Sequence, residues 1–115
     1  MPSLIIDPVV FEMLKESAGE DFIGELIQTY LTDAPQQIAK LREALAQNNP
    51  EVFRRVAHSI KSSSANFGAA RVVELARDLE MAGRANALDG AAALIVRLEE
   101  EYRQAAQALQ KLGPL

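Results

Sequence analysis

Between Ile23 and Leu45, apolar residues recur at every third or fourth position without losing phase. This spacing predicts an amphipathic helix that buries one stripe along its whole length. Pro35 lies within the stripe, and a proline inside a helix removes a backbone donor and crowds the preceding turn. Because the stripe keeps its phase across Pro35, we expect one kinked helix here rather than two separate helices. The stripe consists of Ile23, Ile27, Tyr30, Ala34, Ile38, Leu41 and Leu45.

Helix start and stop signals divide the rest of the chain into four further helices. Asp7-Pro8 and Asn49-Pro50 each place a capping side chain before a proline, and glycines end the segments that follow. The expected ranges are 8–19, 50–67, 69–83 and 91–112. Short connections favour antiparallel neighbours, so we predict an all-α fold, an antiparallel four-helix bundle with an additional short N-terminal helix.

The expected core is apolar and contains no cofactor site. In the helix from residue 50, Val56, Ile60, Ser63 and Phe67 lie near the buried face. We interpret six of the larger side chains of the chain as core filling rather than as a cofactor pocket. This set comprises Met13, Met81, Phe11, Phe22, Phe53 and Phe67.

Length and composition exclude several classes of function. A chain of 115 residues has the size of one domain, so we expect a single domain over residues 1–115. The absence of cysteine rules out disulfides, thiolate metal sites and thiol nucleophiles. A net charge of −4 opposes binding to nucleic acid or to anionic lipid. We find no signal peptide or membrane-spanning run, and expect a cytoplasmic location, either alone or as the cytoplasmic portion of a larger membrane sensor kinase.

One histidine, His58, offers the main opportunity for chemistry. On a helical wheel it lies opposite Val56 and Ile60, so we expect it to face solvent. Its neighbours on that face are two cations, a hydroxyl and a methyl, from Arg54, Lys61, Ser62 and Ala65. Residues 54 to 84 carry six basic and three acidic groups, a net charge of +3 in an otherwise acidic chain. Such surroundings favour a neutral, nucleophilic imidazole and an anion placed on it. An exposed helical histidine without any function fits the same geometry.

The segment from Ala57 to Gly68, AHSIKSSSANFG, resembles the A-H-x-L-K-G-S-S-x-x-x-G signature of the histidine-containing phosphotransfer (HPt) domain family. The run LARDLE from Leu75 to Glu80 is similar to that family's L-C-x-x-L-E stretch, and the segment from Phe11 to Pro35 is similar to its first two helices. Ser62 stands where the family usually has glycine, and Ala76 where it often has cysteine.

The resemblance implies a phosphocarrier in a two-component phosphorelay. His58 would accept a phosphoryl group from a receiver-domain phosphoaspartate and pass it to another receiver aspartate, and Lys61 would offset the charge on that group. Gly68 would form the turn that closes the active helix. The domain would have no kinase activity of its own and no cofactor, because the receiver partner would bring the Mg²⁺ and most of the catalysis.

The expected partners are response-regulator receiver domains and a hybrid sensor histidine kinase, with the chain itself a monomer. Arg54, Arg55, Ser62 and Ala65 are the candidate docking residues, and Arg54 would meet an acidic receiver surface. A helical adaptor that docks receivers without being phosphorylated is the alternative. The sequence favours the carrier, since an adaptor has no need for His58 with Lys61 beside it.

Overall fold

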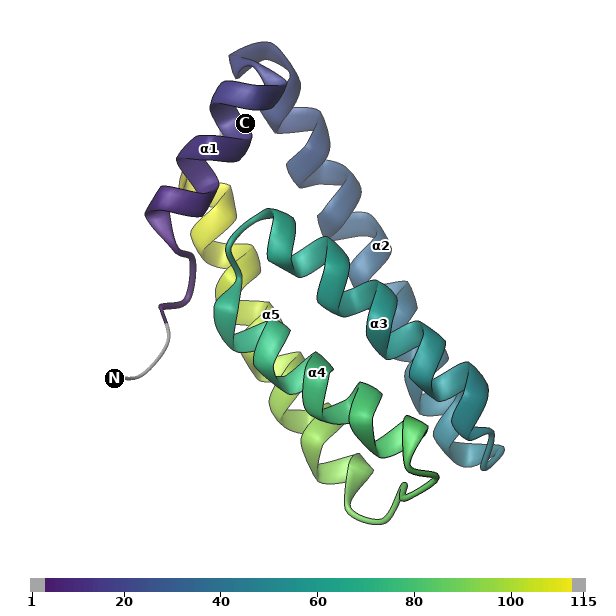
Figure 1. Ribbon diagram of the computed structural model, residues 1–115. Coiled ribbons are helices and arrows are strands. Elements are labelled where there is room, and N and C mark those ends of the chain that lie inside the picture. The colour runs from purple at the N-terminus through teal and green to yellow at the C-terminus, as the bar shows by residue number, and fades with distance from the viewer. Residues whose placement is uncertain (1–3, 113–115) are drawn as a thin grey trace.

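The computed structural model describes residues 4–112, which form five α-helices and no strand (Figure 1). The helices are α1 (Pro8–Ala18), α2 (Glu20–Ala46), α3 (Pro50–Asn66), α4 (Ala70–Arg84) and α5 (Ala91–Leu112). The predicted all-α fold is confirmed. In the described range, no helix combines the length and the apolar character that crossing a membrane requires.

The expected capping residues begin two of the helices. The Asp7 side chain accepts from the backbone N–H of Val9 at 2.9 Å at the start of α1. The Asn49 side chain accepts from the N–H of Val52 at 3.2 Å at the start of α3. Each bond satisfies a donor that has no partner within the helix, and the proline that follows loses no helical bond.

The helix α2 continues through Pro35 without a break, as the unbroken stripe predicted. Six of the seven stripe residues are buried, and Leu45 packs against the core as a partly buried neighbour. Pro35 itself is exposed. Burial of the opposite face therefore holds the helix together across the missing backbone bond.

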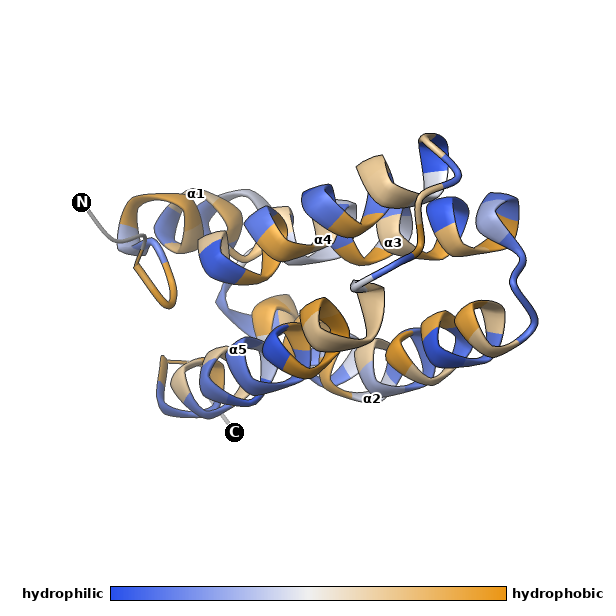
Figure 2. Cartoon of the chain, turned by 90° about the horizontal axis from the view of Figure 1, so that it is seen from below, coloured by the Kyte–Doolittle hydropathy of each residue, from blue (hydrophilic) through white to orange (hydrophobic). Residues whose placement is uncertain are grey.

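The four longer helices form the bundle. α2 packs on α3, α3 on α4, α4 on α5, and α5 on α2, so the helices close a ring around the core (Figure 1). Seen from below, hydrophobic residues gather on the faces that the helices turn toward one another (Figure 2). The short helix α1 packs on α2 and α3 at one end of the bundle.

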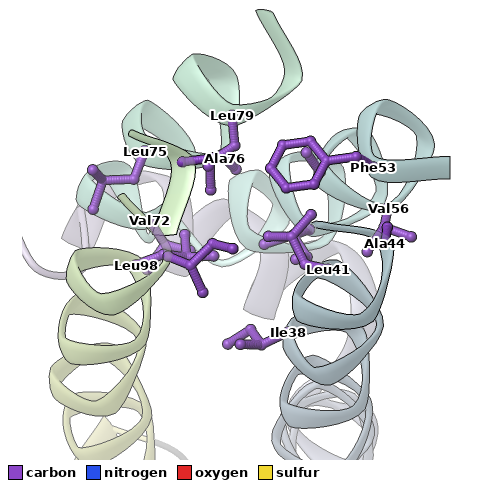
Figure 3. Close-up of a cluster of buried hydrophobic side chains, with 14 of the residues drawn as sticks. Ile38, Leu41, Ala44, Phe53, Val56, Val72, Leu75, Ala76, Leu79 and Leu98 are labelled. Atoms are coloured by element: carbon purple, nitrogen blue, oxygen red, sulfur yellow. The ribbon is translucent and has the colours of Figure 1, made fainter. Parts of the chain in front are cut away.

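The main core lies between all four long helices. Leu41, Phe53, Leu79 and Leu98 are fully buried and come from four different helices (Figure 3). Each such side chain stabilises the fold by about 1.5–3 kcal/mol through burial. A second cluster, which includes Phe11, Tyr30 and Phe67, packs α1 against the same end of the bundle.

Three residues expected in the core lie on the surface instead. Met13, Phe22 and Met81 are 64%, 52% and 60% exposed. Phe22 directly precedes the buried Ile23, and one residue is a rotation of about 100° on a helix, which turns the side chain away from the stripe. Residue type alone therefore gave the wrong prediction for these three side chains.

Gly68 connects α3 to α4 and also holds the start of α1. Its φ is +74°, a conformation that favours glycine, and its carbonyl accepts from the Asp7 N–H at 2.8 Å. A Cβ at this position would lie 2.9 Å from the Asp7 carbonyl oxygen. The turn therefore needs glycine for both its backbone angle and this close approach.

Candidate functional site

His58 projects from the outer face of α3. Its side chain is 56% exposed, whereas Ala57 and Ile60 on the same helix are buried in the core. The predicted outward orientation is confirmed. A rigid helix, packed along its other side, thus presents the imidazole to solvent.

A carboxylate from the neighbouring helix meets the ring. Glu80 on α4 is only 5% exposed, and its Oε2 lies 2.9 Å from His58 Nδ1. The carboxylate can only accept in this contact, so Nδ1 carries the ring proton and donates it. The other ring nitrogen, Nε2, has no polar partner within residues 4–112. Nε2 is therefore the nitrogen with a free lone pair.

Two cations hold the same carboxylate. Lys61 Nζ lies 2.6 Å from Oε1 of Glu80, and Arg84 Nη2 lies 3.4 Å from Oε2. The hydrogen bond from Lys61, supported by that from His58, holds the pKa of Glu80 below its ordinary value even though burial acts in the opposite direction. Glu80 is therefore an anion in contact with the imidazole, with Lys61 and Arg84 beside it.

Sequence reasoning about His58 missed Glu80, because it considered only neighbours on the same helix. The two residues are 22 positions apart, but each is 11 positions from Ala69, at the turn between α3 and α4. In an antiparallel helical hairpin, residues equally far from the turn lie side by side. The distance from the turn could therefore have identified Glu80.

Gly83 allows α3 and α4 to approach closely at this site. It is buried, and a Cβ there would lie 3.0 Å from the backbone N and Cα of Arg54. We expected α4 to end at Gly83, but the helix continues to Arg84. The glycine serves helix packing rather than termination. Arg54 lies one turn before His58, so the close approach occurs directly beside the site.

The candidate docking residues lie around His58 on α3. Arg55, Ser62 and Ala65 are exposed. Arg54 is partly buried and lines a shallow hollow together with Arg84 of α4. The structure therefore brings all four predicted residues onto the surface around the imidazole, with a second cation from α4 beside Arg54.

The three serines after Lys61 have different environments. Ser62 is exposed, and the Ser63 hydroxyl donates to the Ile60 carbonyl at 3.2 Å. Ser64 is fully buried and shares a 2.7 Å hydrogen bond with the Tyr30 hydroxyl. We expected Ser63 on the buried face, but Ser64, four residues after Ile60, continues the stripe.

Metal ligands do not gather anywhere in the described part of the chain. Within residues 4–112, no group of three or more histidine, aspartate or glutamate side chains is placed to hold an ion. The chemistry that the site offers is that of one imidazole with an ionic partner.

Known proteins share both this fold and this sequence pattern. The Hpt domain family model matches residues 25–108. The phosphorelay protein LuxU of Vibrio harveyi is 27% identical over 84 residues, which cover 73% of this chain and 74% of that protein. Histidine-containing phosphotransfer protein B (HptB) from Pseudomonas aeruginosa PAO1 superposes with a TM-score of 0.90 at 28% identity, covering 96% of this chain and 95% of that one. MtHPt2 from Medicago truncatula gives a TM-score of 0.77 at 27% identity, covering 94% and 78%.

Proposed function

The chain belongs to the Hpt domain family and is a histidine phosphotransfer protein of phosphorelay signalling, and on this basis we propose that His58 is the residue that carries the phosphoryl group. The observation that supports this most is the free Nε2 on an exposed ring, with Nδ1 held by Glu80. His58 is also the only histidine of the chain.

In the proposed reaction, Nε2 attacks the phosphorus of a receiver-domain aspartyl phosphate in line with the bond that breaks. The N–P bond forms, the P–O bond breaks, and the aspartate leaves as a carboxylate with the electron pair of that bond. The reverse attack by a second receiver aspartate then removes the phosphoryl group. Such transfers depend mainly on positioning and on stabilising charge, and we propose that the receiver and its Mg²⁺ supply most of both.

Lys61 is suited to the predicted role beside the phosphoryl group. Its ammonium group has three donors, one of which contacts Glu80 at 2.6 Å. The remaining donors can face a phosphoryl oxygen on Nε2 without breaking that ion pair. We therefore assign Lys61 to offsetting the charge of the transferred group.

Arg54, Arg55, Ser62 and Ala65 form the proposed receiver-docking surface. Arg54 and Arg55 carry positive charge beside His58, while Ser62 and Ala65 are small enough to let a partner come close. Complementary charge speeds encounter and is screened by salt. Added salt should therefore slow transfer without reducing helicity, and a rate that does not respond to salt would contradict docking through these arginines.

We also propose that the chain is a monomeric carrier without kinase activity, supplied by a hybrid sensor kinase. Its site offers one nucleophile, His58, together with the charges of Glu80, Lys61 and Arg84. Incubation with Mg-ATP alone should leave the protein unlabelled. Labelling by ATP in the absence of a kinase would contradict this part of the proposal.

The decisive test is transfer from a radiolabelled, phosphorylated receiver domain. Wild-type protein should gain acid-labile, alkali-stable phosphate, and His58→Gln should gain none. Ser59→Ala, which alters the exposed neighbour of His58, is the matched control and should label normally. Receiver binding without labelling would favour the adaptor, and acid-stable label on Ser62, Ser63 or Ser64 would refute the assignment.

A further inference from the structure

Ser62 carries the one serine hydroxyl of α3 that makes no hydrogen bond within the described part of the chain. Ser59 and Ser63 each donate to a backbone carbonyl at 3.2 Å, and Ser64 shares its 2.7 Å bond with Tyr30. Ser62 is exposed, and among residues 4–112 its hydroxyl has neither a backbone nor a side-chain partner. A donor is therefore free on the surface that carries His58.

The position of Ser62 brings this donor toward His58. Residues four apart lie on neighbouring turns of the same helix face, with about 5–6 Å between their Cβ atoms. Helical side chains lean toward the N-terminus, so the side chain of Ser62 lies over the turn that carries His58. The free hydroxyl is therefore on the imidazole side of its own turn.

The two flanks of the ring differ. Viewed along α3, Lys61 lies about 60° to one side of His58 and Ser62 about 40° to the other. Lys61 and Nδ1 of His58 both contact Glu80, so the Lys61 flank faces α4. The bonds of the two ring nitrogens point in nearly opposite directions. Nε2 is therefore turned away from α4, toward the flank of Ser62.

Resting on the function proposed above, we propose that the Ser62 hydroxyl donates a hydrogen bond to a phosphoryl oxygen on His58 and stabilises the phosphorylated state. A hydrogen bond to an anionic oxygen is stronger than one between neutral groups. With Lys61 on the other flank, the phosphoryl group is held from two sides. Ser62 keeps its own proton, so the N–P bond forms and breaks as in the proposed reaction. Glycine, which the HPt signature has at this position, offers no side-chain donor.

Such a hydrogen bond has a thermodynamic consequence that docking does not have. It is present in the phosphorylated protein and absent from the unphosphorylated one, so it shifts the equilibrium of transfer toward phosphorylated His58. A contact between Ser62 and a docked receiver exists only in the complex. That contact changes the forward and the reverse rate by the same factor and leaves the equilibrium constant between the free proteins unchanged.

The test measures this equilibrium constant for wild type, Ser62→Ala and Ser62→Gly with one receiver domain, labelled by radioactive acetyl phosphate. Rapid-quench runs that start from the labelled receiver and from the labelled carrier give the second-order rate constants in both directions, and their ratio is the equilibrium constant. Ser59→Ala is the matched control, since it removes a neighbouring hydroxyl that already bonds to the Arg55 carbonyl. Ser62→Ala should keep its fold, because the position is exposed and alanine is the strongest helix former.

In Ser62→Ala and Ser62→Gly, we expect the equilibrium constant to move about fivefold toward the phosphorylated receiver, the contribution of a typical net hydrogen bond. Ser59→Ala should match wild type. An unchanged equilibrium constant in both Ser62 variants would overturn the inference even if both rates change, because that result assigns Ser62 to docking alone. A change in only one of the two would also overturn it, since both lack the hydroxyl.

Labelling separates this inference from the proposed function. If wild type and Ser59→Ala take acid-labile phosphate on His58, the proposed function holds, and the equilibrium constants decide the role of Ser62. If neither takes label, the proposed function fails, and the inference fails with it.

Discussion

Replacing Gly83 with alanine tests whether the close approach of α3 and α4 shapes the site. In an unhindered helix, glycine to alanine gains up to about 1 kcal/mol of helix stability. Here the new Cβ would lie 3.0 Å from the backbone N and Cα of Arg54, atoms that cannot move without shifting α3. Overpacking of this kind costs about 1–3 kcal/mol. The two effects together predict that Gly83→Ala lowers the free energy of unfolding by about 0–2 kcal/mol.

Urea unfolding of Gly83→Ala measures the net change in the free energy of unfolding. Ala39→Gly, at an exposed position within α2, measures the difference in helix propensity between alanine and glycine without any crowding. Its free energy of unfolding should fall by about 1 kcal/mol. Gly83 also lies one turn from Glu80, so spreading the helices should weaken the 2.9 Å contact at His58 and alter its ¹⁵N tautomer signals. A Gly83→Ala protein stabilised by about 1 kcal/mol, with an unchanged histidine spectrum, would refute the argument.

Three other perturbations test the fold around the site, each by urea or pH-dependent unfolding. The free energy of unfolding of Gly68→Ala should fall by about 2–4 kcal/mol, because alanine is unfavourable in the left-handed backbone conformation of this position and its Cβ would be crowded. A fall of less than about 0.5 kcal/mol would contradict this expectation. The free energy of unfolding of Ser64→Ala should fall by about 1–3 kcal/mol, because the buried Tyr30 hydroxyl loses its hydrogen-bond partner. Adding Tyr30→Phe should recover part of that free energy, and no recovery would count against the hydrogen bond. The folded state lowers the pKa of Glu80, so the ionised carboxylate stabilises the fold above the unfolded value of about 4.3. This stabilisation is lost as the pH falls through the lower folded value. The free energy of unfolding of Glu80→Gln should therefore fall less steeply with acid than that of wild type.

The features that local sequence determines were predicted correctly. Helix periodicity and capping residues depend on neighbours three or four positions away, so the helices, the unbroken passage through Pro35 and the outward direction of His58 followed from spacing alone. The resemblance to the HPt family added the identity of the fold. These predictions needed no knowledge of how distant segments meet.

The errors concern contacts between helices and positions on a helix face. Glu80 reaches His58 only because α3 and α4 pair antiparallel about their turn, and Gly83 fits against Arg54 for the same reason. Phe22 and Met81 were placed in the core by residue type, but their angular positions turn them toward solvent. Helix spacing alone would have placed these two side chains on the surface, whereas the contacts of Glu80 and Gly83 depend on how the helices pack, which single-helix reasoning does not include.

The position of phosphorus on the imidazole tests the central claim most directly. His58 is the only histidine, so protein labelled with ¹⁵N-histidine gives one set of imidazole nitrogen signals. After transfer from a receiver, ³¹P–¹⁵N coupling therefore identifies the nitrogen that is bonded to phosphorus without ambiguity. We predict direct coupling to Nε2, with Nδ1 still protonated beside Glu80. Phosphorus on Nδ1, or on a serine with the histidine signals unchanged, would contradict the account.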